Sequence, residues 1–155
     1  MSKIISRDYE MTGGKITAFN ATVLDMSTST PAFSGRIASV SPTAGIGYAT
    51  GAGGAVTQAT SKATGATLSK VSGAITMNGA ALAAGVIVSF VLTNTAVAAG
   101  DVLVLNHISG GTIGSYTLNA QCAAGSATIN IRNNTAGSLS EAIVIQFALI
   151  KAVSA

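Results

Sequence analysis

Charged side chains are scarce in this sequence. Asp, Glu, Lys and Arg make up 8% of its 155 residues, against about a quarter in an ordinary soluble domain. Apolar residues make up 48%. Because charge is the main barrier to non-specific association, a free monomer with such a surface would aggregate. We therefore expect much of the surface to be buried against other subunits, or to be covered with Ser, Thr, Asn and Gly.

Cysteine and tryptophan are also nearly missing. Cys122 is the single cysteine, and there is no tryptophan. One cysteine excludes an intrachain disulfide and a Cys-based metal cluster. A chain of this length can bury an adequate core without such cross-links, so packing and hydrogen bonds must stabilise the fold.

Runs of basic residues are absent as well. The 8 basic and 5 acidic side chains give a net charge of +3 without any Lys- or Arg-rich stretch. Nucleic-acid binding therefore has little electrostatic support, and no nucleic-acid partner is expected. The N-terminal residues "MSKIISRDYE" contain no apolar signal core, which predicts synthesis and residence in a cytoplasm.

A membrane segment must be considered because residues 71–100 carry no charge. The apolar part, residues 80–100, is long enough to span a bilayer. However, it contains polar residues, alternates in polarity and lacks flanking Lys or Arg. We expect strands there, and no membrane partner.

What the sequence has in abundance is alternation of apolar and polar residues with period 2, which is typical of half-buried strands. Such strands are expected over 86–93, 101–108, 116–122, 127–133 and 143–150, with a further strand over 74–77. Gly- and Asn-containing turns separate them. The pattern predicts an all-β fold, an antiparallel β-sandwich or jelly-roll-like domain over residues 45–155.

The first forty-four residues differ in composition from the rest. They hold more than half of the charged residues and both prolines, Pro31 and Pro42. We interpret residues 1–44 as an extended N-terminal arm or a small β-substructure, not as a second globular domain.

Alternation also assigns faces to the strands. In the last strand, Ile143, Ile145, Phe147 and Leu149 are expected to point inward. The outward faces of strands 101–108 and 143–150 are expected to stay apolar, with Leu103, Leu105, Val144, Ala148 and Ile150. In a monomeric sandwich these side chains would be exposed to solvent, so we expect them to contact a neighbouring subunit around a threefold or similar cyclic axis.

The stretch "GIGYATGAGGAVTQATSKATG" at 45–65 is the most tempting candidate for a ligand site. Its third glycine falls one residue late for a dinucleotide fingerprint, and no helix is expected to follow. We interpret the small residues as allowing close backbone packing. Residues 56–64, "VTQATSKAT", are expected to form an exposed strand with a polar, threonine-rich face.

No catalytic, cofactor or metal site is predicted. His107 is the only histidine, and Asp101 is the nearest carboxylate in sequence. A general base or a metal ligand needs partners that this inventory does not supply. Cys122 has an inward phase and is expected to be a buried, inert thiol. Tyr48 and Tyr116 could stack on a sugar or base, but core or subunit contacts are favoured. We therefore expect that the protein is not an enzyme.

Residues 45–94 match a frame shared by structural proteins of tailed bacteriophages, which the chain resembles. The frame reads GxGYxTGAGGxVTQxTSKxTGVTLNxxxGxITMxxAALAAGxxVxFxLTN, and the chain departs from it at Ala66 and Ser69. The later segments "NHISGGTIGSYTL" and "RNNTAGSLSEAIVIQFALIK" resemble the same family. The similarity runs from Gly45 to the C-terminus and leaves residues 1–44 unmatched.

This resemblance implies a non-catalytic β-domain at the surface of virions or in fibres. The short chain with an arm suits a head decoration (cement) protein, which would be a homotrimer bound to the major capsid protein at the capsid surface. Strand addition by the arm and apolar burial would supply the binding energy. The expected capsid or subunit contacts are Ile4, Ile5, Tyr9, Met11, Ile16, Phe19, Phe33, Leu103, Leu105 and Ile150. The polar face of residues 57–62 is the alternative attachment surface.

Two other functions remain open at this point. A head or tail fibre or receptor-binding module would recognise host-surface glycans, although aromatic residues make up only 5% of the chain. A polysaccharide lyase or depolymerase would need paired carboxylates in a cleft, and the five acidic residues argue against it.

Overall fold

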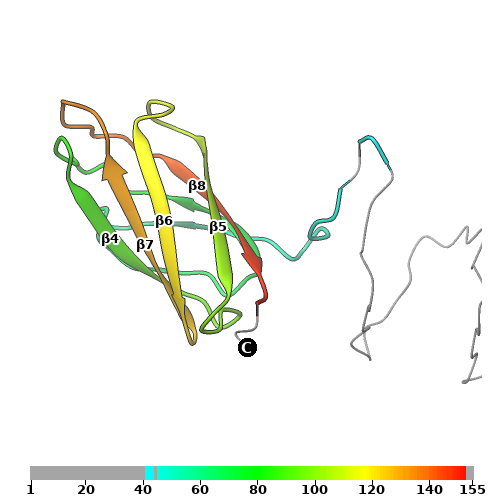
Figure 1. Cartoon of the computed structure of the whole chain (residues 1–155). Coiled ribbons are helices and arrows are strands. Elements are labelled where there is room, and N and C mark those ends of the chain that lie inside the picture. The colour runs from blue at the N-terminus through cyan, green and yellow to red at the C-terminus, as the bar shows by residue number, and fades with distance from the viewer. Residues whose placement is uncertain (1–40, 44, 153–155) are drawn as a thin grey trace, which may run out of the picture. The chain divides into compact units, whose positions relative to one another are not determined.

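The fold is an all-β sandwich, as predicted. A computed structural model describes residues 41–43 and 45–152, and these residues contain strands and loops but no helix (Figure 1). The strands are β1 (Ala55–Thr57), β2 (Ala66–Thr67), β3 (Ser72–Thr76), β4 (Ile87–Thr93), β5 (Val102–Ser109), β6 (Tyr116–Ala123), β7 (Ser126–Asn133) and β8 (Val144–Ile150). Nothing in the described part of the chain is a helix long and apolar enough to cross a membrane.

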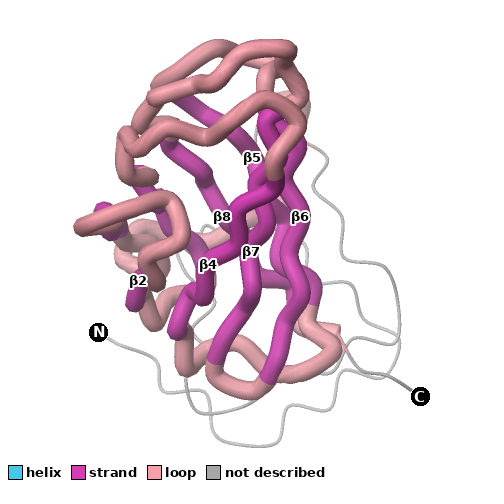
Figure 2. The backbone as a smooth tube through the Cα atoms, turned by 90° about the vertical axis from the view of Figure 1, so that its left-hand side faces the viewer, coloured by secondary structure: helices cyan, strands magenta, loops and turns pink. Residues whose placement is uncertain are grey.

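The strands form two sheets, which lie in two layers with loops gathered at their ends (Figure 2). One sheet has the order β1-β3-β8-β5, and the other has the order β2-β4-β7-β6. The antiparallel pairs are nested: β3 pairs with β8, and β4 pairs with β7 inside it. This nesting places early and late parts of the chain side by side, as in a jelly roll.

The two shortest strands depart from the predicted antiparallel arrangement. β1 runs parallel to β3, and β2 runs parallel to β4. The reason is that the chain alternates between the two sheets from β1 through β4. Each sheet therefore receives two strands in the same direction, joined by a crossover instead of a hairpin.

The core lies between the sheets and follows the predicted alternation. The paired residues Ile75 and Ile145 have no exposed surface, because residues directly opposite in an antiparallel pair share a face. The other buried apolar side chains include Met77, Phe90, Leu92, Ala127, Ile129, Ile131, Ile143, Phe147 and Leu149. The inward face predicted for the last strand, with Ile143, Ile145, Phe147 and Leu149, is therefore confirmed.

The face assignment for β5 was wrong. Leu103 pairs with Leu149 and Leu105 pairs with Phe147, so both leucines point into the core. The outward positions that they were expected to fill belong to Val102 and Val104. The sequence "VLVL" is apolar on both faces, so alternation could not set the phase, and pairing with β8 did. On β8 the outward positions of Val144, Ala148 and Ile150 are as predicted.

The expected contacts in the N-terminal arm lie outside the described residues. These are Ile4, Ile5, Tyr9, Met11, Ile16, Phe19 and Phe33. The division of the chain into an arm over 1–44 and a sandwich over 45–155 stays a prediction.

Candidate functional site

The glycine-rich stretch is fastened to the sandwich by two buried polar side chains, Gln58 and Lys62, each 3% exposed. The side-chain amide of Gln58 donates to the backbone oxygens of Lys62 at 3.1 Å and Thr64 at 2.8 Å. Its amide oxygen accepts the backbone N–H of Asn78 at 3.1 Å, just after β3. One side chain thus closes the loop 58–64 and joins it to the neighbouring strand.

The ammonium group of Lys62 completes this attachment. Lys62 Nζ donates to the backbone oxygens of Asn78 at 2.6 Å and Glu141 at 2.5 Å. Burial lowers the pKa of Lys62, and the negative charge of Glu141 partly opposes this shift. The two carbonyl oxygens replace water around the buried charge. The same two bonds join the segment of Lys62 to those of Asn78 and Glu141. Its role is structural.

The interpretation of residues 56–64 as an exposed polar strand was therefore wrong. Strand β1 ends at Thr57, and two of the polar side chains that follow, Gln58 and Lys62, are buried, while Thr60 between them is exposed. Sequence reasoning missed them because Gln and Lys among small residues usually face water. Their partners are backbone groups remote in sequence, so no local pattern signals them.

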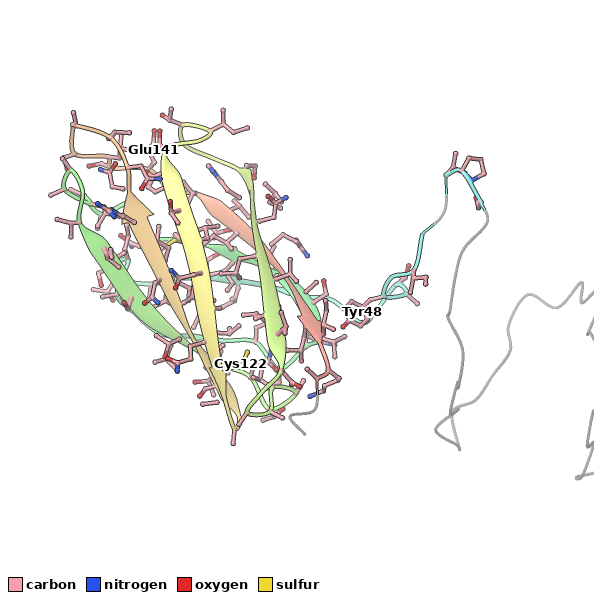
Figure 3. The ribbon with its side chains drawn as sticks, in the orientation of Figure 1. Tyr48, Cys122 and Glu141 are labelled. Carbon is pink, nitrogen blue, oxygen red and sulfur yellow. The ribbon has the colours of Figure 1, made fainter. Side chains whose placement is uncertain are left out.

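A second polar cluster surrounds the carboxylate of Glu141, which lies at the end of the sandwich where β6 begins (Figure 3). Thr112 donates twice, from its backbone N to Oε2 at 3.0 Å and from its hydroxyl to Oε1 at 2.6 Å. The hydroxyl of Tyr116 donates to Oε2 at 2.7 Å. The bond from the Thr112 hydroxyl is the largest cause of a lowered pKa of Glu141. Burial, followed by the bond to Glu141, raises the pKa of Tyr116. Both carboxylate oxygens thus accept hydrogen bonds within the protein.

His107 lies beside this cluster. Its ring meets that of Tyr116 edge-on, with the ring centroids 5.9 Å apart. Its Nε2 atom lies 3.0 Å from the backbone oxygen of Ser109 and 2.5 Å from that of Gly110. Since both neighbours are acceptors, Nε2 must carry the proton. The geometry fits a histidine that holds a loop.

A hollow of about 90 Å³ lies beside His107, lined by His107, Ile108, Ser109, Gly110, Gly111 and Ile113. Sites for small molecules usually enclose about 300 Å³ or more, so this hollow is too small for one. Within residues 41–43 and 45–152, no three His, Cys, Asp or Glu side chains gather to hold a metal ion.

At the other end of the sandwich, Asp101 and Lys151 form an ion pair with Oδ2 and Nζ 2.7 Å apart. The bond from Lys151 is the main cause of a lowered pKa of Asp101, and the backbone N–H of Ala98 adds to it. Cys122 lies at this end on β6 (Figure 3) and packs against the core, which confirms its predicted inward phase, but it is only partly buried and not fully buried as predicted. Burial, then the charge of Asp101, raises the pKa of its thiol. Such a thiol is a poor nucleophile at neutral pH.

The outer face of the sheet β2-β4-β7-β6 carries a network of polar side chains. Ser89 donates to the side-chain oxygen of Asn130 at 2.5 Å, and Asn130 donates to that of Asn119 at 2.7 Å. These side chains come from three adjacent strands and form a polar ladder across the sheet. These hydroxyl and amide groups share the face with the exposed Arg132 and with the half-exposed Ile87 and Val91.

The outer face of the other sheet, β1-β3-β8-β5, is different. Val102 pairs with Ile150, and Val104 pairs with Ala148, so these four side chains form one contiguous patch, the apolar corner. Val102, Val104 and Ile150 are 50%, 47% and 54% exposed. None of the described outward positions of this sheet carries a charge: Ala55, Thr57, Ser72, Ala74, Thr76, Val102, Val104, Asn106, Ser109, Val144, Gln146, Ala148 and Ile150.

Among the predicted contact residues that the structure describes, only Ile150 is therefore on the surface. Its neighbours on β5 are Val102 and Val104, not the predicted Leu103 and Leu105. No protein-family model, no curated protein and no solved structure matches this chain.

Proposed function

We propose that the chain is a structural protein of a tailed-bacteriophage virion, most simply a capsid decoration (cement) protein. It would assemble as a homotrimer in the host cytoplasm and bind the major capsid protein at the capsid surface. The proposal rests on the resemblance of residues 45–94 to phage structural proteins and on the surface chemistry of the sandwich.

The single observation that carries the proposal is the uncharged outer face of the sheet β1-β3-β8-β5, with the apolar corner at one end. A charge-free face with half-exposed Val102, Val104 and Ile150 is unfavourable in a free monomer and favourable at a contact between proteins. The polar ladder on the opposite sheet supplies the solvent-facing side that a surface-bound protein needs.

The chemistry of the motif also supports a non-catalytic role. Gln58 and Lys62, from the shared string "VTQATSK", make hydrogen bonds that hold the fold together. The acidic groups of the described residues, Asp101 and Glu141, accept bonds from Lys151, Thr112 and Tyr116. Neither carboxylate is placed as a free general base.

Attachment would combine several weak contacts. The arm residues from Ile4 to Phe33 would add a strand or apolar anchors to the capsid, and Ile150 would contribute from the sandwich. In a trimer, three such contacts raise the effective affinity well above that of one.

Electron microscopy of particles with and without the protein tests the proposal. The decoration hypothesis predicts extra density on heads that carry the protein, and heads that lose their contents on heating when it is missing. A protein found on fibres, with intact heads and lost adsorption, would contradict it.

That second outcome would favour a fibre or receptor-binding module for host-surface glycans. The observation on its side is the amide-rich ladder of Ser89, Asn119 and Asn130, because amides and hydroxyls hydrogen-bond sugars. The three side chains already bond to one another, so this function is the second candidate.

A further inference from the structure

The segment after β3 contains the one Asn–Gly pair of the sequence, Asn78–Gly79. In such a pair the backbone nitrogen of the glycine can attack the side-chain carbonyl carbon of the asparagine, because the glycine has no Cβ that obstructs the approach. Gly79 is exposed, and a Cβ built on it would meet nothing within 4 Å. Among the described residues, none accepts a hydrogen bond from the backbone N–H of Gly79. The nucleophilic nitrogen is therefore open to water.

The side-chain carbonyl group of Asn78, which this nitrogen would attack, is polarised by a hydrogen bond. Asn78 Oδ1 accepts the backbone N–H of Ala80 at 2.8 Å. This bond closes a short ring that contains both reacting atoms, Asn78 Cγ and the nitrogen of Gly79, and it restricts their relative motion. It also places a donor at the oxygen on which negative charge develops during the attack.

The buried ammonium of Lys62 acts on the peptide bond between Asn78 and Gly79. Lys62 Nζ donates to the backbone oxygen of Asn78 at 2.6 Å. That oxygen and the nitrogen of Gly79 belong to one peptide group, whose electrons are delocalised over both atoms. A charged donor on the oxygen draws electron density from the nitrogen. The N–H of Gly79 is therefore easier to deprotonate, which the attack requires.

We propose that Asn78 is a site of spontaneous modification, at which the folded chain converts asparagine to isoaspartate through a cyclic imide with Gly79. Hydroxide from the solvent removes the N–H proton of Gly79, and the nitrogen attacks Asn78 Cγ. The Cγ–Nδ2 bond breaks, and Nδ2 leaves as ammonia with a proton taken from water. Water then opens the imide, so one water is consumed and one ammonia is released. Nδ2 donates to the backbone oxygen of the exposed Ala59 at 3.0 Å, so the ammonia leaves on the solvent side.

Lys62 also determines which product forms. Water that attacks Cγ of the imide gives aspartate, whereas water that attacks the former backbone carbonyl of Asn78 gives isoaspartate. Lys62 Nζ binds the oxygen of the second carbonyl, so it stabilises the oxyanion on the path to isoaspartate. In that product the same oxygen belongs to a free carboxylate, with which the buried ammonium forms an ion pair. The attachment of the loop 58–64 is thus kept after the reaction.

The reaction needs neither a capsid nor a second copy, so its outcome is independent of the proposed function and the purified full chain suffices for the test. One sample is incubated folded at mildly alkaline pH, and a second is incubated in guanidinium chloride at the same pH. Peptide mapping by mass spectrometry with electron-transfer fragmentation then measures asparagine, aspartate and isoaspartate at position 78. We expect conversion in the folded chain to be at least as fast as in the denatured chain, with a ratio of isoaspartate to aspartate at least about tenfold higher. Slower conversion in the folded chain, or the same ratio in both samples, would overturn the proposal.

Three variants separate the chemistry from the fold. Gly79→Ala places a Cβ in open space on a backbone without positive φ, and it should slow conversion at least about tenfold because a side chain hinders the attack. Lys62→Met removes the ammonium and should lower the product ratio of the folded chain to that of the denatured chain. Lys70→Met is the matched control, because Lys70 is exposed and its Nζ donates to the oxygen of Gly51; it should change neither rate nor ratio. A folded Lys62→Met chain that keeps the excess of isoaspartate would refute the role of Lys62. Far-UV circular dichroism checks folding, and the comparison of folded with denatured wild type decides the proposal if Lys62→Met unfolds.

Discussion

Replacing Gln58 with alanine should lower the free energy of unfolding of the sandwich more than a substitution on its polar surface does. The substitution removes three hydrogen bonds at a position that is 3% exposed. It leaves the backbone N–H of Asn78 and the oxygens of Lys62 and Thr64 without that partner. At about 1 kcal/mol net for each bond, the free energy of unfolding should fall by roughly 3 kcal/mol.

A loss of this size is a large part of the total, since small domains unfold at about 5–15 kcal/mol. It corresponds to a fall in Tm of more than about 10 °C for a domain of this size. Because the chain has no tryptophan, far-UV circular dichroism in a urea titration is the appropriate assay. Protein concentration must be held constant because self-association adds to apparent stability.

Gln121→Ala is the matched control, because Gln121 is an exposed side chain on β6. Its substitution should change the free energy of unfolding by less than about 0.5 kcal/mol. If Gln58→Ala and Gln121→Ala have the same urea midpoint, the loop 58–64 is not fastened as described, and the structural explanation of the motif is refuted.

Three further predictions concern the loop ends and the thiol. The pKa of Glu141 is lowered in the folded state. The ionised carboxylate therefore adds to the free energy of unfolding above the ordinary glutamate pKa of about 4.3, and this stabilisation is lost as the pH falls through the lower folded value. Glu141→Gln should reduce the dependence of stability on pH in this acid range. Gly111→Ala should destabilise far more than Gly114→Ala in thermal melts, since both have positive φ but only Gly111 has neighbours where a Cβ would lie; equal losses would show that the loop is loosely packed. The raised pKa of Cys122 predicts slow reaction with a thiol reagent at pH 7 and fast reaction in urea, and equal rates would place the thiol in water.

The sequence was sufficient for the parts of the fold that alternate cleanly. In β7, Ile129 and Ile131 alternate with Asn130 and Arg132, so only one phase buries the apolar side chains. In β5, both faces are apolar, and the phase came from the pairing of Leu103 with Leu149. That pairing is a long-range contact which no local pattern contains.

The polar ties were beyond prediction for a related reason. Lys62 is buried because Asn78 and Glu141 present backbone oxygens to it, and any residue type could supply those oxygens. The hydrogen bond between Thr112 and Glu141 also joins residues that are far apart in sequence and lie on different loops. The composition predicts a surface that is partly buried against other subunits, but the pairing of β5 with β8 was needed to locate the apolar corner.

The central claim is that a chain with so few ionic groups hides its apolar corner against other copies. Sedimentation velocity of the full chain at neutral pH and low micromolar concentration tests this claim most directly. The account predicts an assembled species, a trimer in the simplest case, that dissociates on dilution. A well-behaved single-chain species throughout that concentration range would contradict it.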